Sequence, residues 1–139
     1  MRFNHPLIEE VIIQKLDVAD YQAIYFDDNL SRIVFERKGG FSDLWKTMTS
    51  DYDRFRKEVI RAKEQKLMMY IVINGSFTKV MKGFKHSQVK GITIVRTLFT
   101  LWLKYGVHHK FCNSEEEMVE FMTQMFIWGL QKQLFYKRN

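Results

Sequence analysis

Residues 20–43 constrain this chain most, because they read as two strands joined by a tight turn. The expected strands, residues 21–26 and 31–38, are rich in aromatic and β-branched side chains, which favour extended backbone. Between them lie Asp27, Asp28 and Asn29, residue types whose side chains bond to the local backbone and favour turns. We therefore predict an antiparallel hairpin with its turn centred on Asp28.

The predicted register brings two acids together. With the turn at Asp28, Asp20 lies opposite Glu36, and directly opposed residues have Cβ atoms roughly 4.5–5.5 Å apart. Because strand side chains alternate, Glu36 and Lys38 share one face and Arg37 points to the other. Two opposed carboxylates repel each other, and a divalent cation between them would remove that repulsion. Their hard oxygen atoms suit Mg²⁺ or Mn²⁺.

Lys38 and Asp43 complete this candidate site. The ammonium of Lys38 could orient a water or steady a phosphoryl oxygen, and Asp43 follows the Gly39-Gly40 break, where a helix could carry it toward the same place. An acid followed by E-x-K is the pattern of a metal-dependent phosphodiesterase. E-x-K is also common at the charged ends of exposed hairpins, so on the residues alone both interpretations stay open.

Length and composition indicate one globular domain covering residues 1–139. The chain is 46% hydrophobic and 15% aromatic, which is enough for a buried core and too apolar for disorder. No linker composition suggests a boundary, and the one cysteine excludes an internal disulfide framework. No apolar run is long enough to span a membrane. We expect a cytoplasmic protein, or one in the host nucleoid or nucleus if it is viral.

The charge balance favours a polyanionic partner. The net charge is +6, from 22 basic and 16 acidic residues, and the pI is near 9.4. Residues 74–91 hold no acid, three glycines, one histidine and four lysines: Lys79, Lys82, Lys85 and Lys90. We predict a flexible loop or short helix that contacts a phosphate backbone. A solvated basic surface is the alternative.

The rest of the pattern predicts an α/β fold. β-branched or apolar runs predict strands at 9–16, 67–73 and 107–112, and the continuously apolar second run suits a central strand. Apolar periodicity predicts helices at 41–48, 51–65, 87–105 and 114–135, with N-caps at Ser42, Asp51 and Ser114. Strands and helices in this order indicate a mixed central sheet flanked by helices on both faces.

Several motifs resemble those of the XPF-type structure-specific endonucleases, a family that includes the archaeal Hef nuclease. The chain has L-D-V-A-D-Y and F-E-R-K-G-G-F-S-D-L where that family has G-D-Y and V-E-R-K-x-x-x-D-L. Residues 53–58 are similar to the family's G-R-(L/F)-x-x-Q helix, and residues 70–75 to its L-L-I-E-G strand. Further similarity at 89–91 and 105–107 extends the resemblance over roughly residues 16–126.

The chain also departs from the family's pattern. One more residue separates Lys38 from Asp43 than in the tightest form of the motif, Ala19 replaces a glycine, and Asn74 replaces a glutamate. The family's leading V-D-x-R-E strand and its helix-hairpin-helix tail have no counterpart. We therefore expect a stand-alone nuclease domain, of viral or mobile-element type, for which a partner protein could supply targeting.

The resemblance implies a restriction-endonuclease-like fold and Mg²⁺- or Mn²⁺-dependent hydrolysis of phosphodiester bonds. The substrate would be branched DNA, such as flaps, forks and junctions, as in repair and recombination. By this resemblance Asp20, Glu36 and Asp43 would bind or position the metal, with help from the backbone carbonyl of Arg37. Lys38 would orient the attacking water or stabilise the phosphorus centre.

The expected partners follow from the basic charge of the chain and from the family resemblance. The basic residues expected to contact DNA are Arg37, Arg54, Lys79, Lys82, Lys85 and Lys90. The family works as dimers, and we predict a homodimer formed by the 87–105 helix and the apolar tail 126–136. An active DNA endonuclease is the first prediction, and a non-catalytic nuclease-like module that binds DNA or a partner protein is the alternative. RNA cleavage is a more distant third.

Overall fold

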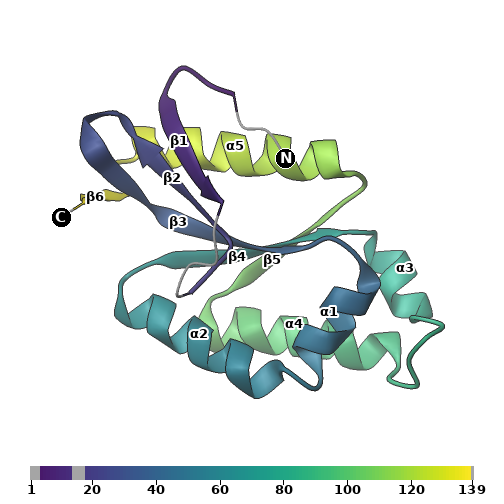
Figure 1. Ribbon diagram of the computed structural model, residues 1–139. Helices are drawn as coiled ribbons and strands as arrows, with labels where there is room; N and C mark the ends of the chain where they lie inside the picture. Colours follow the sequence, from purple (N-terminus) through teal and green to yellow (C-terminus); the bar gives the residue numbers. More distant parts are fainter. Residues whose placement is uncertain (1–3, 14–17, 139) are drawn as a thin grey trace.

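The computed structural model describes residues 4–13 and 18–138 and has a layered α/β architecture (Figure 1). Among these residues, one sheet contains β1 (Ile8–Ile13), β2 (Tyr21–Tyr25), β3 (Asn29–Lys38), β4 (Met68–Asn74), β5 (His108–Cys112) and β6 (Phe135–Lys137). The helices are η1 (Phe26–Asp28), a 3-10 turn, and α1 (Phe41–Met48), α2 (Tyr52–Glu64), α3 (Phe77–Lys82), α4 (Gly91–Tyr105) and α5 (Glu115–Gln131). No helix in the described part of the chain has the length and apolarity needed to cross a bilayer.

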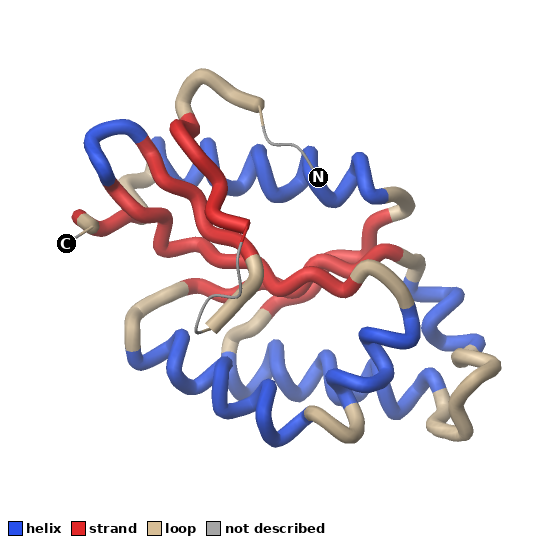
Figure 2. The backbone as a smooth tube through the Cα atoms, in the orientation of Figure 1, coloured by secondary structure: helices blue, strands red, loops and turns tan. Residues whose placement is uncertain are grey.

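β3 is the strand around which the sheet is built. The order is β1-β2-β3-β4-β5, antiparallel as far as β3 and parallel from β3 to β5. In Figure 2 these strands form the red layer between the blue helices. The second half of β3 pairs with β4, and its first three residues pair with β6 on the same side. The predicted mixed sheet is confirmed, and the 67–73 strand is central as predicted.

Helices cover both faces of this sheet, as predicted (Figure 1). α5 packs on one face, where Phe35 of β3 contacts Phe126 with ring centroids 5.1 Å apart. α1, α2 and α4 pack on the other, over a buried cluster that includes Val34, Ile71 and Leu98. Neighbouring residues of β3 therefore enter two different cores, because strand side chains alternate.

The β2–β3 hairpin forms, although its turn is centred one residue earlier than predicted. Asp27 and Asp28 adopt left-handed backbone at φ 66° and 63°, a conformation that aspartate tolerates. Tyr25 pairs with Asn29 next to the turn, and an irregularity between Gln22 and Ile24 then shifts the register. Beyond that bulge Tyr21 pairs with Phe35, which is the predicted alignment at the candidate site.

The predicted start of α4 and the predicted N-cap of α1 are wrong. α4 begins at Gly91 and not at Ser87, because the Ser87 Oγ accepts a hydrogen bond from the Val89 N–H at 3.1 Å and forms a turn. The Val89 carbonyl is also taken, by the indole Nε1–H of Trp45 at 2.9 Å. α1 is capped by Gly40 and not by Ser42.

The last helix is shorter than predicted, and a strand follows it. α5 ends at Gln131, Gln133 takes a left-handed φ of 61°, and the Leu134 N–H bonds to the Gly129 carbonyl at 2.8 Å. Glutamine at the left-handed position gives none of the sequence indication that glycine would give. The predicted Ser114 capping box is confirmed: its Oγ accepts from the Glu117 N–H at 3.0 Å. Residues 14–16 of the predicted first strand lie outside the described residues.

Candidate active site

Glu36 and Lys38 form a buried ion pair near the end of β3. The Lys38 Nζ lies 2.9 Å from the Glu36 Oε2, and the two residues are only 5% and 8% exposed, respectively. Both lie on the sheet face covered by α1 and α2, which matches the predicted alternation. Parallel pairing with β4, Glu36 to Ile71 and Lys38 to Ile73, fixes this stretch of backbone.

Asp20 lies beside the pair because it extends the β2–β3 ladder by one residue. Its N–H donates to the Phe35 carbonyl, and its Oδ2 accepts from the Arg37 N–H, both at 2.9 Å. This backbone clamp brings the Asp20 carboxylate to the strand segment that carries Glu36. The predicted approach of Asp20 to Glu36 is thus present in the geometry, and the charge of Asp20 helps to raise the pKa of Glu36.

α1 and α2 close a pocket of about 160 Å³ over the ion pair. Asp43, in the first turn of α1, lies 3.6 Å from the Lys38 Nζ and is more than half exposed. α2 contributes Arg54 and Glu58, which lie one helical turn apart and so face the same way. The pocket is lined by Glu36, Lys38, Asp43, Lys46, Thr47, Asp51, Arg54, Phe55 and Glu58.

Burial and neighbouring acids make Glu36 hard to ionise. Burial raises the pKa of its carboxyl from 4.5 to about 7, Lys38 opposes this shift, and Asp20 and Glu58 add to it. For Glu58, burial likewise raises the pKa, while Arg61 and Arg54 oppose the rise. Neighbouring carboxyl groups thus raise the pKa values of Glu36 and Glu58, and the nearby cations lower them.

Lys38 supplies the cationic charge in this arrangement. Burial works to lower its pKa, but the carboxylates of Glu36, Asp43 and Asp20 outweigh that effect and raise the pKa above its usual value. Lys38 therefore holds its proton at neutral pH and offers a fixed positive charge at a buried position. Such a charge can stabilise anionic oxygen more strongly than one in bulk water.

The predicted arginines lie in different places. The side chain of Arg37 points to the α5 face, where its Nη2 lies 3.0 Å from a Glu115 oxygen, so only its backbone belongs to the Glu36 site. Arg54 lines the pocket and pairs with Asp51 at 2.9 Å. Arg54 is therefore placed to meet an anion entering the pocket, and the Arg37 side chain is not.

The four predicted lysines lie away from this pocket, on α3 and the loop that follows it. Lys82, Lys85 and Lys90 line a second, larger cavity, whereas Lys79 lies on α3 outside its lining. Sequence reasoning missed Glu58 as a site residue. The four-residue spacing from Arg54 would have indicated it, since residues so spaced share a helix face.

A family model described as the ERCC4 domain matches residues 3–125, most of the chain. The chain belongs to the ERCC4 domain family. No curated protein matches the chain. ERCC4 domains are typically nucleases, generally metal-dependent, and this membership confirms the predicted family.

Two solved structures of XPF from Aeropyrum pernix share the fold of this ERCC4 domain. The XPF complex with DNA superposes with a TM-score of 0.61 over 86% of this chain, and a second XPF structure with 0.63 over 85%, each at 17% identity. This chain spans 52% of the length of each XPF chain. The predicted nuclease-type α/β fold is thereby confirmed.

The donor atoms of this ERCC4 domain fit a hard divalent cation in type and charge. Asp20, Glu36 and Asp43 offer carboxylate oxygens. Burial and neighbouring acids raise the pKa of Glu36, so an additional cation would favour its ionised form. Among the described residues, no group of three Asp, Glu, His or Cys side chains is spaced to enclose an ion. Lys38, between Glu36 and Asp43, holds that space. Metal binding would therefore require Lys38 to turn away from Glu36.

Proposed function

We propose that this ERCC4 domain is a metal-dependent DNA endonuclease that hydrolyses phosphodiester bonds in branched or structured DNA. The observation that carries the proposal is the buried Glu36–Lys38 pair, aligned with Asp20 by the hairpin and roofed by Asp43 and Arg54. A buried ammonium beside several carboxylates is unfavourable in a purely structural site. The free energy needed to remove these charged groups from water can exceed the electrostatic attraction that the ion pair gains. Displaced pKa values of this kind cluster at functional sites.

Each residue has a distinct role in the proposed reaction. Asp20, Glu36 and Asp43, with the Arg37 carbonyl, would hold Mg²⁺ or Mn²⁺. When bound, the metal would supply a water of lowered pKa and offset phosphate charge. Lys38 keeps its proton and stabilises the extra negative charge on the phosphate oxygens as the water adds and the leaving oxygen departs.

Arg54 and the basic residues outside the pocket would position the DNA. Arg54 is mostly exposed at the mouth of the pocket, where it can contact a phosphate next to the one being cleaved. The A. pernix XPF structure contains DNA, which supports DNA as the polymer. The excess of basic residues supports a polyanionic substrate independently.

One observation favours the alternative of a non-catalytic binding module. Lys38 occupies the space between Glu36 and Asp43, and the buried pair could serve to fix the strand end without any metal. In that case DNA would bind without being cut. The experiment below separates the two functions.

The test compares cleavage of labelled flap, fork and plain duplex DNA in Mn²⁺ by the wild type and Glu36→Gln. We expect the wild type to cut the branched substrates and the variant to lose at least ~100-fold in rate. Glu64→Gln, which alters an exposed carboxylate on α2, should cut like the wild type. Equal cleavage by wild type and Glu36→Gln would discard the site, and tight binding of DNA without cleavage would favour the binding module. The same flap made of RNA tests the choice of polymer.

We also propose that the domain forms a homodimer. The predicted interface combined the 87–105 helix with the C-terminal tail, but α4 and α5 cover opposite faces of the sheet (Figure 1). α4 by itself exposes Phe99, Trp102 and Leu103, and the Trp102 ring stacks on His108 of the edge strand β5 at 4.5 Å. This apolar surface, defined by those four residues, supports pairing of two copies through α4 and β5.

A further inference from the structure

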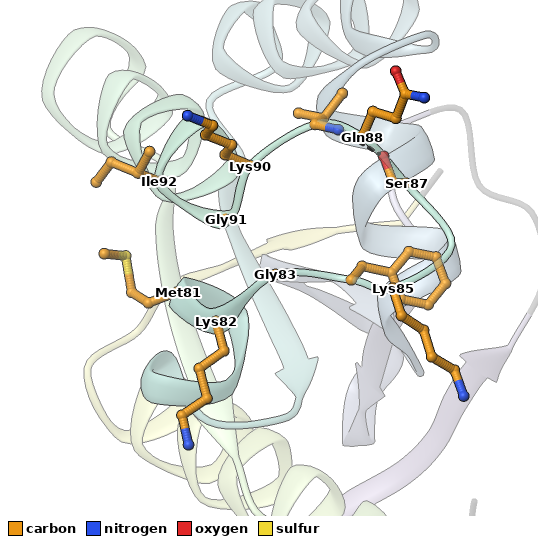
Figure 3. A pocket seen from close by; sticks show the side chains of 11 residues that line it. Met81, Lys82, Gly83, Lys85, Ser87, Gln88, Lys90, Gly91 and Ile92 are labelled. Carbon is orange, nitrogen blue, oxygen red and sulfur yellow. Dashed lines mark hydrogen bonds between the residues drawn. The ribbon is translucent and has the colours of Figure 1, made fainter.

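A cavity larger than the Glu36 pocket lies beside the loop that joins α3 to α4. It measures about 530 Å³ and is enclosed by residues 81–92 (Figure 3). Ligand pockets typically fall between about 300 and 1,000 Å³. Met81, Phe84, Val89 and Ile92 give it apolar surface, while Ser87 and Gln88 add polar groups. A mixed lining of this kind suits a flat, partly polar ligand such as a nucleobase.

Three lysines surround this cavity. Lys82, Lys85 and Lys90 extend outward from its rim in Figure 3, and none of them forms an ion pair with a residue that the structure describes. The surrounding sequence contains no acid either: from Gln65 to Ser114 there are eight lysines and arginines and not one aspartate or glutamate. The rim therefore carries uncompensated positive charge, which favours phosphate.

The loop is held in place before any ligand binds. The Trp45 Nε1–H bonds to the Val89 carbonyl at 2.9 Å, and the Trp45 ring packs on Phe84 with centroids 5.6 Å apart. The Ser87 N–H bonds to the Phe84 carbonyl at 2.9 Å. Gly91 lets α4 approach α3 so closely that a Cβ there would lie 2.0 Å from the Val80 oxygen. A preformed pocket binds with little ordering cost.

The cavity is also tied to the candidate active site. Trp45, which anchors the loop, follows Asp43 by two residues in α1, a rise of about 3 Å along the helix. A strand bound at the loop would thus lie close to the helix that roofs the Glu36 pocket. Paired bases are stacked within the duplex, so only an unpaired base could enter such a cavity.

We propose that this loop cavity binds one unpaired nucleotide of the DNA substrate, with its base inside and its phosphates on Lys82, Lys85 and Lys90. The proposal rests on the proposed nuclease function, and it specifies how such a nuclease would select DNA with a single-stranded branch. The cavity would hold the unpaired strand while the junction enters the Glu36 pocket.

The first test measures binding in EDTA, so that no cleavage occurs. The probes are a fluorescein-labelled 12-nucleotide thymidine strand and a blunt duplex of equal length, followed by fluorescence anisotropy with the full chain. We expect the single strand to bind more tightly than the duplex. The triple variant Lys82→Gln, Lys85→Gln, Lys90→Gln should weaken single-strand binding at least ~10-fold and flatten the salt dependence by about two units of log–log slope, since each phosphate contact contributes about 0.7.

A matched triple variant controls for lost charge. Lys66→Gln, Lys104→Gln, Lys110→Gln removes three exposed lysines from the same acid-free segment but away from the cavity, and we expect less than ~3-fold weakening. If the two triple variants weaken binding equally, the lysines act only as general charge and the proposal is overturned. Tighter binding of the duplex than of the single strand would also overturn it.

The second test locates the base by photo-crosslinking. A thymidine strand containing one 5-iodouracil is irradiated with the wild type, and the crosslinked peptide is identified by mass spectrometry. We expect crosslinks within residues 81–92, and crosslinks only elsewhere would contradict the proposal. Neither test requires catalysis: crosslinks in the loop with no cleavage of any substrate would remove the nuclease function alone. Cleavage with crosslinks only elsewhere would remove the cavity proposal alone.

Discussion

Glu36 and Lys38 each determine the charge that the other can carry. The lysine is the nearest cation to a carboxyl that burial and two neighbouring acids make difficult to ionise. The carboxylates in turn keep the buried ammonium protonated. Removing either member should therefore change stability in a way that depends on pH, and both effects can be measured without any substrate.

Lys38→Met should destabilise the protein more at high pH than at low pH. At pH 8 the wild type gains the attraction between ionised Glu36 and Lys38, whereas in the variant Glu36 has lost the cation that lowers its pKa and must stay protonated or be charged without a partner. Breaking a buried pair typically costs ~3–5 kcal/mol. At pH 5 Glu36 is protonated because its pKa is about 7, so the loss should be smaller. Urea unfolding at both pH values measures the difference. Lys46→Met, at an exposed lysine, should cost less than ~1 kcal/mol; equal losses by Lys38→Met at both pH values would contradict the expectation.

The raised pKa of Glu36 should also make the wild type less stable as pH rises. Because the pKa in the fold, about 7, exceeds the ordinary 4.5, this contribution is fully present below pH 4.5 and is lost as pH rises through about 7. The whole change is at most ~3–4 kcal/mol, since one pKa unit corresponds to about 1.4 kcal/mol. Glu36→Gln cannot titrate, so the difference in unfolding free energy between the two proteins should shift over this window in the direction that favours the variant. A difference that stays constant from pH 4.5 to 8 would disprove the assignment.

For single residues, the sequence predicted that Glu36 and Lys38 share a face of the strand, but not that both are buried. The two-residue period places Glu36 and Lys38 together and Arg37 opposite, and the structure agrees. Their depth depends on α1 and α2 folding over the strand, and Glu58 joins from a helix distant in sequence. The hairpin gives no indication of either contribution, so the 160 Å³ pocket and the place of Glu58 in it could not have been predicted from residues 20–43 alone.

Among the helices and strands, α3 and α4 approach each other very closely, and the absence of a Cβ at Gly91 makes this approach possible. At Gly91 an added Cβ would lie 2.0 Å from the backbone oxygen of Val80 and 2.7 Å from that of Met81. Backbone cannot move aside as the tip of a side chain can. At Gly129 in α5 the nearest atom, at 2.7 Å, is the flexible Cδ1 of Ile33.

Gly91→Ala should therefore be much more costly than Gly129→Ala. We expect Gly91→Ala to lower the unfolding free energy by more than ~2 kcal/mol, because α3 and α4 would have to separate. Gly129→Ala should change it by less than ~1 kcal/mol, since alanine favours the helix by nearly as much as the Ile33 shift costs. Chemical denaturation of both variants measures this. Similar losses in the two would show that the close approach of the helices does not limit the fold.

Element types followed from sequence better than element ends. Periodicity found α1, α2, α4 and α5, and the apolar run found β4. The ends failed where side chains decide locally: Ser87 turns the chain ahead of α4, and a left-handed Gln133 ends α5 so that β6 can form. The sequence of β6 gives no strand pattern. This strand forms because residues 29–31 of β3 are not paired with β4 and are available to pair with it.

For the molecule as a whole, the proposed dimer gives a direct prediction. Sedimentation at tens of micromolar should show a dimer, and Leu103→Asp should shift it to monomer, because Leu103 is 85% exposed on the α4 surface. Phe26→Asp changes another exposed apolar residue, in the hairpin turn, and should leave the dimer intact. A wild type that sediments as a monomer at that concentration would remove the proposal.

The alternation along β3 has one further consequence. Phe35 and Arg37 face α5, while Val34, Glu36 and Lys38 face α1 and α2. The composition of both cores and of the Glu36 pocket therefore depends on one register of this strand. A slip by a single position would expel the charged pair from its pocket and bury polar groups under α5. Hydrolysis that depends on Glu36 would therefore require the correct register of β3, and loss of cleavage in a variant could signal a shifted strand as well as a damaged site.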